Sequence, residues 1–184
     1  MPLWIVRHAR PLIATGVCYG VLDVAADPVA TAEAAQALAQ ALPPSARLRV
    51  SPLLRCQQLA RALQTLRPEL QAVTDPLLRE MDFGTWEGVP WSAIPQATVQ
   101  AWTDDFGTHR FGGAESANAV LARVASAFDV CRHDQHTVWI SHAGVARAAA
   151  LLANGIRQVV RADQWPQDAP AYGQWSAVPL PPKP

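Results

Sequence analysis

Short apolar runs that alternate with helical stretches are the feature that most constrains this chain. Residues 3–6 form a continuous apolar run, as expected of a parallel strand that is buried on both faces. Leu48 and Val50 predict a second strand, residues 70–73 a third and residues 137–140 a fourth. Alternating strands and helices need right-handed crossovers, which place helices on both faces of the sheet. The sequence therefore predicts a three-layer α/β/α fold with a mainly parallel sheet.

Helix signals fill the intervals between these runs. Residues 27–42 begin with Asp-Pro, an N-cap followed by Pro at the first helical position, and continue with Ala-rich sequence. Residues 51–66 begin with Ser-Pro, and we expect this pair to open a second helix in the same way. Further helices are expected over residues 96–105, 115–133 and 144–153, and a last strand over residues 174–178.

The length and the apolar content indicate one domain. The chain has 184 residues, half of them hydrophobic, which suits a single core of ordinary size over residues 1–184. Residues 77–113 are irregular, with Trp, Gly and Pro interspersed, and predict a lid or insertion. We expect residues 179–184 to form a loose C-terminal tail.

Charge and cysteine usage exclude several classes of protein. Fifteen basic and fifteen acidic residues balance, whereas a general nucleic-acid binder carries a basic excess. The three cysteines form no CxxC pair, which argues against a zinc knuckle or a disulfide framework. The N-terminus lacks a signal-peptide core, and no apolar run reaches membrane-spanning length. We expect a cytoplasmic protein that contacts neither membrane nor nucleic acid.

Polar side chains follow three of the predicted strands at the point where each strand ends. Arg7 and His8 follow the first, Arg55 lies in the first turn after the second, and His142 follows the fourth. In an open parallel sheet, ligands bind beyond the carboxyl ends of the strands. Two helix N-termini at the same edge also favour anions. The two His and two Arg side chains are therefore expected to surround one anion pocket.

The missing motifs narrow the chemistry of that pocket. No Walker-type glycine loop with Lys is present, no GxGxxG follows the first strand, and no HExxH places two His residues on a metal. We therefore expect a phosphate site that needs neither a metal nor an organic cofactor.

Five segments then suggest a family. They are VRHA at 6–9, SPLLRCQ at 51–57, REMDFGTWEG at 79–88, GGAES at 112–116 and ISHAG at 140–144. In this order they resemble the signatures of the histidine phosphatase superfamily, which includes the cofactor-dependent phosphoglycerate mutases. The resemblance spans residues 3–153 and implies a phosphoglycerate mutase-like fold. The third segment and the short length look most like the alpha-ribazole phosphatase group of cobalamin biosynthesis.

The sequence departs from that pattern near the first signature. Ala9 stands where Gly is usual, and Arg10-Pro11 stands where an acidic or amide residue and Thr are usual. The run at 112–115 carries one extra residue. The added charge of Arg10 bears on which substrate is bound more than on the reaction.

The resemblance implies a role for each residue of the pocket. His8 would be the nucleophile that becomes phosphohistidine, because a neutral imidazole attacks well near pH 7. Arg7 and Arg55 would bind the non-bridging phosphate oxygens, and His142 would donate from the far side. Glu80 is our choice for the general acid, with Asp82 and Glu87 as rivals in the same segment.

Other residues are candidates for the substrate pocket. Tyr19, in the loop after His8, is expected to border it, and Glu87 is a further candidate. Arg10 is expected at the rim of the pocket or paired with Asp23.

These expectations lead to a phosphomonoesterase that acts on a small phosphorylated metabolite, with alpha-ribazole 5′-phosphate as a candidate. A phosphoglycerate mutase-type isomerase is the first alternative, because it would use the same phosphohistidine. A catalytically idle module that binds phosphorylated ligands is the second. Either a monomer or a homodimer is compatible with the sequence.

Overall fold

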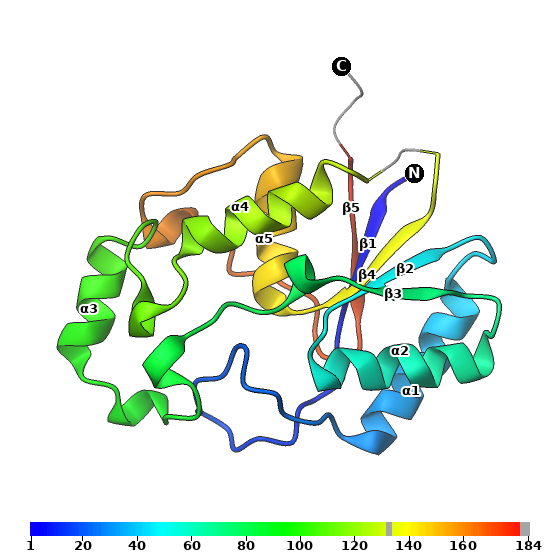
Figure 1. Cartoon of the computed structure of the whole chain (residues 1–184), viewed down its shortest axis with the longest axis horizontal. Coiled ribbons are helices and arrows are strands. Elements are labelled where there is room, and N and C mark those ends of the chain that lie inside the picture. The colour runs from blue at the N-terminus through cyan, green and yellow to red at the C-terminus, as the bar shows by residue number, and fades with distance from the viewer. Residues whose placement is uncertain (132–133, 181–184) are drawn as a thin grey trace.

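The computed structural model describes residues 1–131 and 134–180, and within them five strands form one sheet (Figure 1). The sheet has the order β3-β2-β4-β1-β5. Four strands run parallel, and the last pairs antiparallel with β1 at one edge. The strands are β1 (Leu3–Arg7), β2 (Arg47–Val50), β3 (Ala72–Thr74), β4 (Thr137–Ser141) and β5 (Trp175–Val178). The predicted mainly parallel sheet is confirmed.

Helices cover both faces of this sheet. On one face lie α1 (Pro28–Ala41) and α2 (Leu54–Leu66), and on the other lie α4 (Ala117–Phe128) and α5 (Ala143–Ala153) (Figure 1). Strand β4 shows how side chains divide between the two layers: Val138 and Ile140 pack towards α1 and α2, whereas Trp139 packs towards α4 and α5. This alternation is the period-two pattern of a strand buried on both faces. The three-layer α/β/α fold is therefore as predicted.

Two helix ends differ from the sequence-based expectation. Helix α2 begins at Leu54, three residues after the start of the Ser-Pro pair, and the backbone N–H of Leu54 donates to the carboxylate of Asp23 at 2.6 Å. A carboxylate from a distant loop therefore accepts the hydrogen bond of an otherwise unpaired N–H at the start of this helix. The hydroxyl of Ser51 does not take that role. Helix α4 ends at Phe128 rather than near residue 133, and residues 132–133 lie outside the described part.

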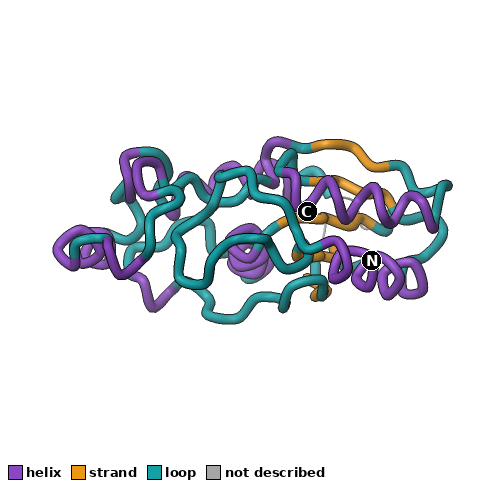
Figure 2. Tube along the Cα trace, turned by 90° about the horizontal axis from the view of Figure 1, so that it is seen from below, coloured by secondary structure: helices purple, strands orange, loops and turns teal. Residues whose placement is uncertain are grey.

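The segment from 77 to 113 lies beside the sheet rather than on it. It contains α3 (Gln96–Asp104) and several single 3₁₀ turns, and Figure 2 shows these helical turns well away from the strands. Its rings form a small core of their own, in which Trp102 and Phe111 stack with centroids 4.6 Å apart. The assignment of this segment as a lid stays a prediction. Of the predicted tail, residues 181–184 lie outside the described part.

Among the described residues, no helix is long and apolar enough to cross a membrane.

Candidate active site

His8 lies buried just beyond the carboxyl end of β1, and its hydrogen bonds define its tautomer. Its Nδ1 lies 2.7 Å from the carbonyl oxygen of Ala9, which can only accept a proton. The proton of the neutral ring is therefore on Nδ1, and Nε2 keeps a free lone pair. This lone pair is the nucleophile that a phosphoryl transfer to His8 needs.

Arg55 holds the nucleophilic nitrogen of His8 in place. The guanidinium is fully buried, and its Nε–H donates to Nε2 of His8 at 3.2 Å. Its other two nitrogens donate to the carbonyl oxygens of Gly20 (2.6 Å) and Leu22 (3.0 Å). Arg55 thus occupies the lone pair of His8 in this structure. A phosphate oxygen must take over that N–H before His8 can attack.

Burial keeps both histidines neutral. Burial, with added repulsion from Arg55, lowers the pKa of His8 to about 3. The pKa of His142 is also held well below its usual range, first by burial and then by the charge of Arg55. The two rings lie 5.1 Å apart between centroids. Near pH 7 the pair is therefore uncharged, as a nucleophilic imidazole requires.

Arg7 supplies positive charge from the last residue of β1. Its guanidinium lies 3.9 Å from the ring centroid of Tyr172, and Nη1 donates to the carbonyl oxygen of Pro170 at 3.2 Å. Its Nε is buried and finds no hydrogen-bond partner among the described residues. Nδ1 of His142 is a second buried nitrogen without such a partner. Unpaired buried polar groups are costly, so the free N–H of Arg7 next to the nucleophile indicates a site for a ligand that accepts hydrogen bonds.

Glu80 is held at the start of α5. One carboxylate oxygen accepts the backbone N–H of Gly144 at 3.1 Å, and the other accepts the N–H of Met81 at 3.0 Å. A Cβ at position 144 would lie 2.2 Å from the carboxylate. Gly144 has an ordinary helical backbone, so the close approach of Glu80 is what requires a glycine there.

One cavity of about 250 Å³ joins these groups. Four of the predicted residues line it, namely Arg7, His8, Tyr19 and Glu80, together with Val17, Phe83, Trp91 and Tyr172. Arg55 contacts Nε2 of His8 and the ring of His142 packs beside it, and neither residue lines the cavity. The structure therefore brings together the five residues predicted to react with or bind phosphate, and Tyr19, predicted to border the substrate pocket, lines the same cavity.

Arg10 and Glu87 were predicted as pocket residues, and neither lines the cavity. Arg10 is exposed and pairs with Asp27 at 2.9 Å, not with Asp23. Asp23 is already engaged by the start of α2.

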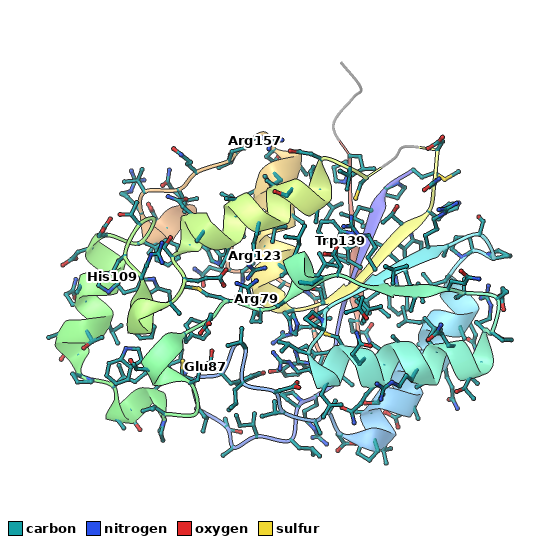
Figure 3. The ribbon with its side chains drawn as sticks, in the orientation of Figure 1. Arg79, Glu87, His109, Arg123, Trp139 and Arg157 are labelled. Atoms are coloured by element: carbon teal, nitrogen blue, oxygen red, sulfur yellow. The ribbon has the colours of Figure 1, made fainter. Side chains whose placement is uncertain are left out.

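Glu87 is engaged by backbone instead of facing the cavity. Its carboxylate accepts hydrogen bonds from the N–H groups of Gly20, Val21, Leu22 and Phe83 at 2.9–3.1 Å, and Figure 3 shows it on the side of the insertion that faces the loop after β1. Asp82 caps its own turn by accepting the N–H of Gly84 at 2.8 Å. Neither rival lines the cavity, whereas Glu80 does.

An ionic cluster that the sequence-based reasoning missed supports the Glu80 segment. Glu115 accepts from Arg79 at 2.9 Å and from Arg123 at 2.8 Å, and Arg123 also donates to the carbonyl oxygen of Glu80 at 3.1 Å. Figure 3 shows the two arginines close together near α4. Tyr172 was missed as well, because it follows a Pro-rich stretch that has no periodic pattern.

A larger hollow of about 560 Å³ lies elsewhere, lined in part by Arg47 and Thr137 at the starts of β2 and β4. Ligands of parallel sheets bind at the opposite ends of the strands, so the smaller cavity beside His8 is the candidate site. No group of three metal-binding side chains occurs in the described part of the chain.

The chain matches a known family over most of its length. The family model described as "Histidine phosphatase superfamily (branch 1)" matches residues 3–171. No curated protein matches the chain.

Several solved structures resemble it. The protein TTHB049 from Thermus thermophilus is 29% identical, with a TM-score of 0.74 over 98% of this chain and 95% of that one. A mycobacterial glucosyl-3-phosphoglycerate phosphatase is 25% identical, with a TM-score of 0.66 over 84% of this chain and 79% of that one. These likenesses confirm the phosphoglycerate mutase-like fold.

Proposed function

The chain belongs to branch 1 of the histidine phosphatase superfamily, and we propose that it is a phosphomonoesterase that passes a phosphoryl group to His8 and then to water. The observation that carries this proposal is the hydrogen bond from Nδ1–H of His8 to the carbonyl oxygen of Ala9. It directs a neutral, unprotonated Nε2 towards the end of the sheet where the cationic groups gather. A small phosphorylated metabolite is the expected partner.

In the first step, the lone pair of His8 Nε2 forms a bond to phosphorus and the P–O ester bond breaks. Glu80 gives its proton to the departing oxygen, which leaves as an alcohol. Arg7 lines the cavity and Arg55 contacts Nε2 of His8, and we assign these two arginines and His142 to the non-bridging oxygens. Such donors stabilise the charge spread over these oxygens in the transition state.

In the second step, water attacks phosphorus and gives a proton to Glu80. The P–N bond breaks, its electron pair returns to Nε2, and His8 is again neutral. Inorganic phosphate leaves, and Glu80 is protonated for the next cycle. One carboxyl group thus acts first as acid and then as base.

The lining of the cavity favours a neutral leaving group. Beyond the groups that face phosphate, the side chains around the cavity are apolar or aromatic: Val17, Tyr19, Phe83, Trp91 and Tyr172. A carboxylate or second phosphate on the substrate would meet no further cation in this lining, and it would meet the carboxylate of Glu80. This favours a phosphatase over a phosphoglycerate mutase, whose phosphoglycerate substrate carries a carboxylate.

Alpha-ribazole 5′-phosphate is our candidate for the natural substrate. Its support is the similarity of residues 79–88 to the alpha-ribazole phosphatase group, together with the aromatic lining of the cavity. A screen of phosphorylated metabolites with steady-state kinetics tests this choice. Equal kcat/KM for alpha-ribazole 5′-phosphate and for simple alkyl phosphates would reject it.

The reaction itself is tested by hydrolysis of p-nitrophenyl phosphate in the presence of a chelator. We expect turnover, and mass spectrometry of the rapidly quenched protein should find one acid-labile phosphoryl group on His8. His8→Asn should abolish both signals while the protein stays folded. Ligand binding without turnover or labelling by the wild type would favour the idle module. Activity that depends on added bisphosphoglycerate would favour the mutase.

A further inference from the structure

Ser51 lies at the carboxyl end of β2, fully buried, and its hydroxyl contacts a residue of the site. Its Oγ lies 2.7 Å from Nε2 of His142. The backbone N–H of Leu53 donates to the same oxygen at 3.3 Å. A hydroxyl has one proton and two lone pairs, so Ser51 can still either donate to the imidazole or accept from it.

Two arrangements of protons fit this contact, and they leave different groups without a partner. If Ser51 donates to Nε2, the ring proton is on Nδ1, and Nδ1–H is the only unpaired group of the pair. If Nε2–H donates to Ser51, the hydroxyl proton can turn to the sulfur of Cys56, with which Ser51 also interacts, and Nδ1 presents a lone pair. Only the first arrangement leaves a donor at Nδ1 for an incoming anion.

A second side chain lies beside Nε2, the thiol of Cys56, whose Sγ is also 3.5 Å from the carbonyl oxygen of Ser141. Sγ of Cys56 lies 3.5 Å from this nitrogen, and burial raises the pKa of the Cys56 thiol to about 12, so the sulfur keeps its proton. A hydroxyl and a thiol therefore crowd one side of the ring. The other nitrogen, Nδ1, is buried and has no partner among the described residues.

We propose that Ser51 is a positioning residue that fixes His142 as the Nδ1–H tautomer, so that the transferred phosphoryl group receives a hydrogen bond from Nδ1. His142 is neutral and has a single proton to give. In the other tautomer it would present a lone pair to the anion, which is repulsive. Ser51 thus sets whether His142 helps or hinders transfer, although it touches no substrate itself. The proposal rests on the proposed function for the step that it serves.

The test reads the tautomer directly, by two-dimensional NMR of the protein labelled with ¹⁵N-histidine. In the wild type we expect Nδ1 of His142 to be protonated and Nε2 to carry the lone pair, both with and without inorganic phosphate. In Ser51→Ala we expect the proton to move to Nε2 in a large fraction of molecules. Ser51→Thr keeps a hydroxyl and should keep the wild-type signals. Ser45→Ala removes an exposed hydroxyl and is the matched control.

Binding and kinetics give the second readout. Ser51→Ala should weaken binding of inorganic phosphate and lower kcat for a phosphomonoester by about 10- to 100-fold, because one donor to the phosphoryl group is lost. KM should change less than kcat. Ser51→Thr should recover most of the loss.

The outcomes separate this proposal from the proposed function. A wild-type His142 that carries its proton on Nε2 overturns the role of Ser51, as does a Ser51→Ala variant whose tautomer and kcat are unchanged. The spectrum of the wild type needs no variant, so poor folding of Ser51→Ala or Ser51→Thr leaves that outcome intact. Failure of the wild type to hydrolyse phosphomonoesters, with the expected tautomer present, would reject the phosphatase and not the assignment of the proton.

Discussion

Adding one methyl group at Gly144 should displace the Glu80 carboxylate without unfolding the protein. In Gly144→Ala, the new Cβ would lie 2.2 Å from one carboxylate oxygen and 3.1 Å from the carboxyl carbon. Normal contact needs about 3.5 Å, so the carboxylate must move by more than about 1 Å. Its hydrogen bond to the N–H of residue 144 would be lost or weakened.

We expect Gly144→Ala to lower the reaction rate and to leave the free energy of unfolding nearly unchanged. Ala is the better helix former by about 1 kcal/mol, which offsets the loss of a hydrogen bond worth about 1 kcal/mol. The thermal midpoint should therefore stay within a few degrees of the wild type. A displacement of about 1 Å in a catalytic group costs roughly 10²-fold, and loss of general acid catalysis costs about 10²–10⁴-fold.

The leaving group shows whether Glu80 is the acid. For an alkyl phosphate, a poor leaving group that needs a proton, kcat/KM should fall about 10²-fold in Gly144→Ala. The anion of 4-nitrophenol leaves without a proton, so kcat/KM for its phosphate, which reports the phosphorylation of His8 and not the later hydrolysis, should fall less than about 10-fold. Glu80→Gln should show the same contrast between the two substrates. An equal loss on both, or no loss on either, would refute the placement of the general acid.

Three further results are expected. Glu87→Ala should lower the free energy of unfolding by about 3 kcal/mol in urea titrations, because several partly buried N–H groups lose their acceptor; a loss below about 1 kcal/mol would contradict its structural role. The pKa of His8 is about 3 in the folded protein and near 6.5 in the unfolded chain. Between these two values the unfolded chain binds more protons, so the free energy of unfolding falls as the pH is lowered. His8 alone should make the protein about 2 kcal/mol less stable at pH 5 than at pH 7.5, and His8→Asn should remove that difference; an unchanged slope would argue that His8 is not buried as a neutral ring. Tyr172→Ala should raise KM for p-nitrophenyl phosphate about 5- to 10-fold, because the ring that stacks on the Arg7 guanidinium is removed; an unchanged KM would mean that the stacking does not orient Arg7.

The convergence of His8, Arg55 and His142 could be predicted because it depends on topology. Each of these residues follows a buried strand, and the ends of neighbouring parallel strands lie side by side. The distances between these three side chains are therefore set by the spacing of the strands in the sheet, however far apart the residues are in the chain. The same reasoning placed α1 correctly, because its Asp cap and its Pro are local signals.

The role of Glu87 could not be predicted, because it depends on backbone rather than on side chains. Most of the N–H groups that donate to its carboxylate come from a loop more than 60 residues earlier in the chain. The residue types in that loop give no sign that its backbone N–H groups need an acceptor. The start of α2 was misplaced for a related reason, since its end is satisfied by Asp23 from the same loop. Hydrogen bonds between distant backbone and a carboxylate follow from the folded shape of a loop, which has no periodic pattern.

The stacking of Tyr172 on Arg7 joins the first strand to a segment that is translated more than 160 residues later. All five sequence signatures leave the ribosome before that segment does, so a growing chain carries the whole nucleophilic apparatus while one wall of its pocket is still missing. Because domains assemble as their chain emerges, the competent pocket is the last part to be completed. The cavity therefore has all of its lining only after the segment before β5 has folded against the edge of the sheet.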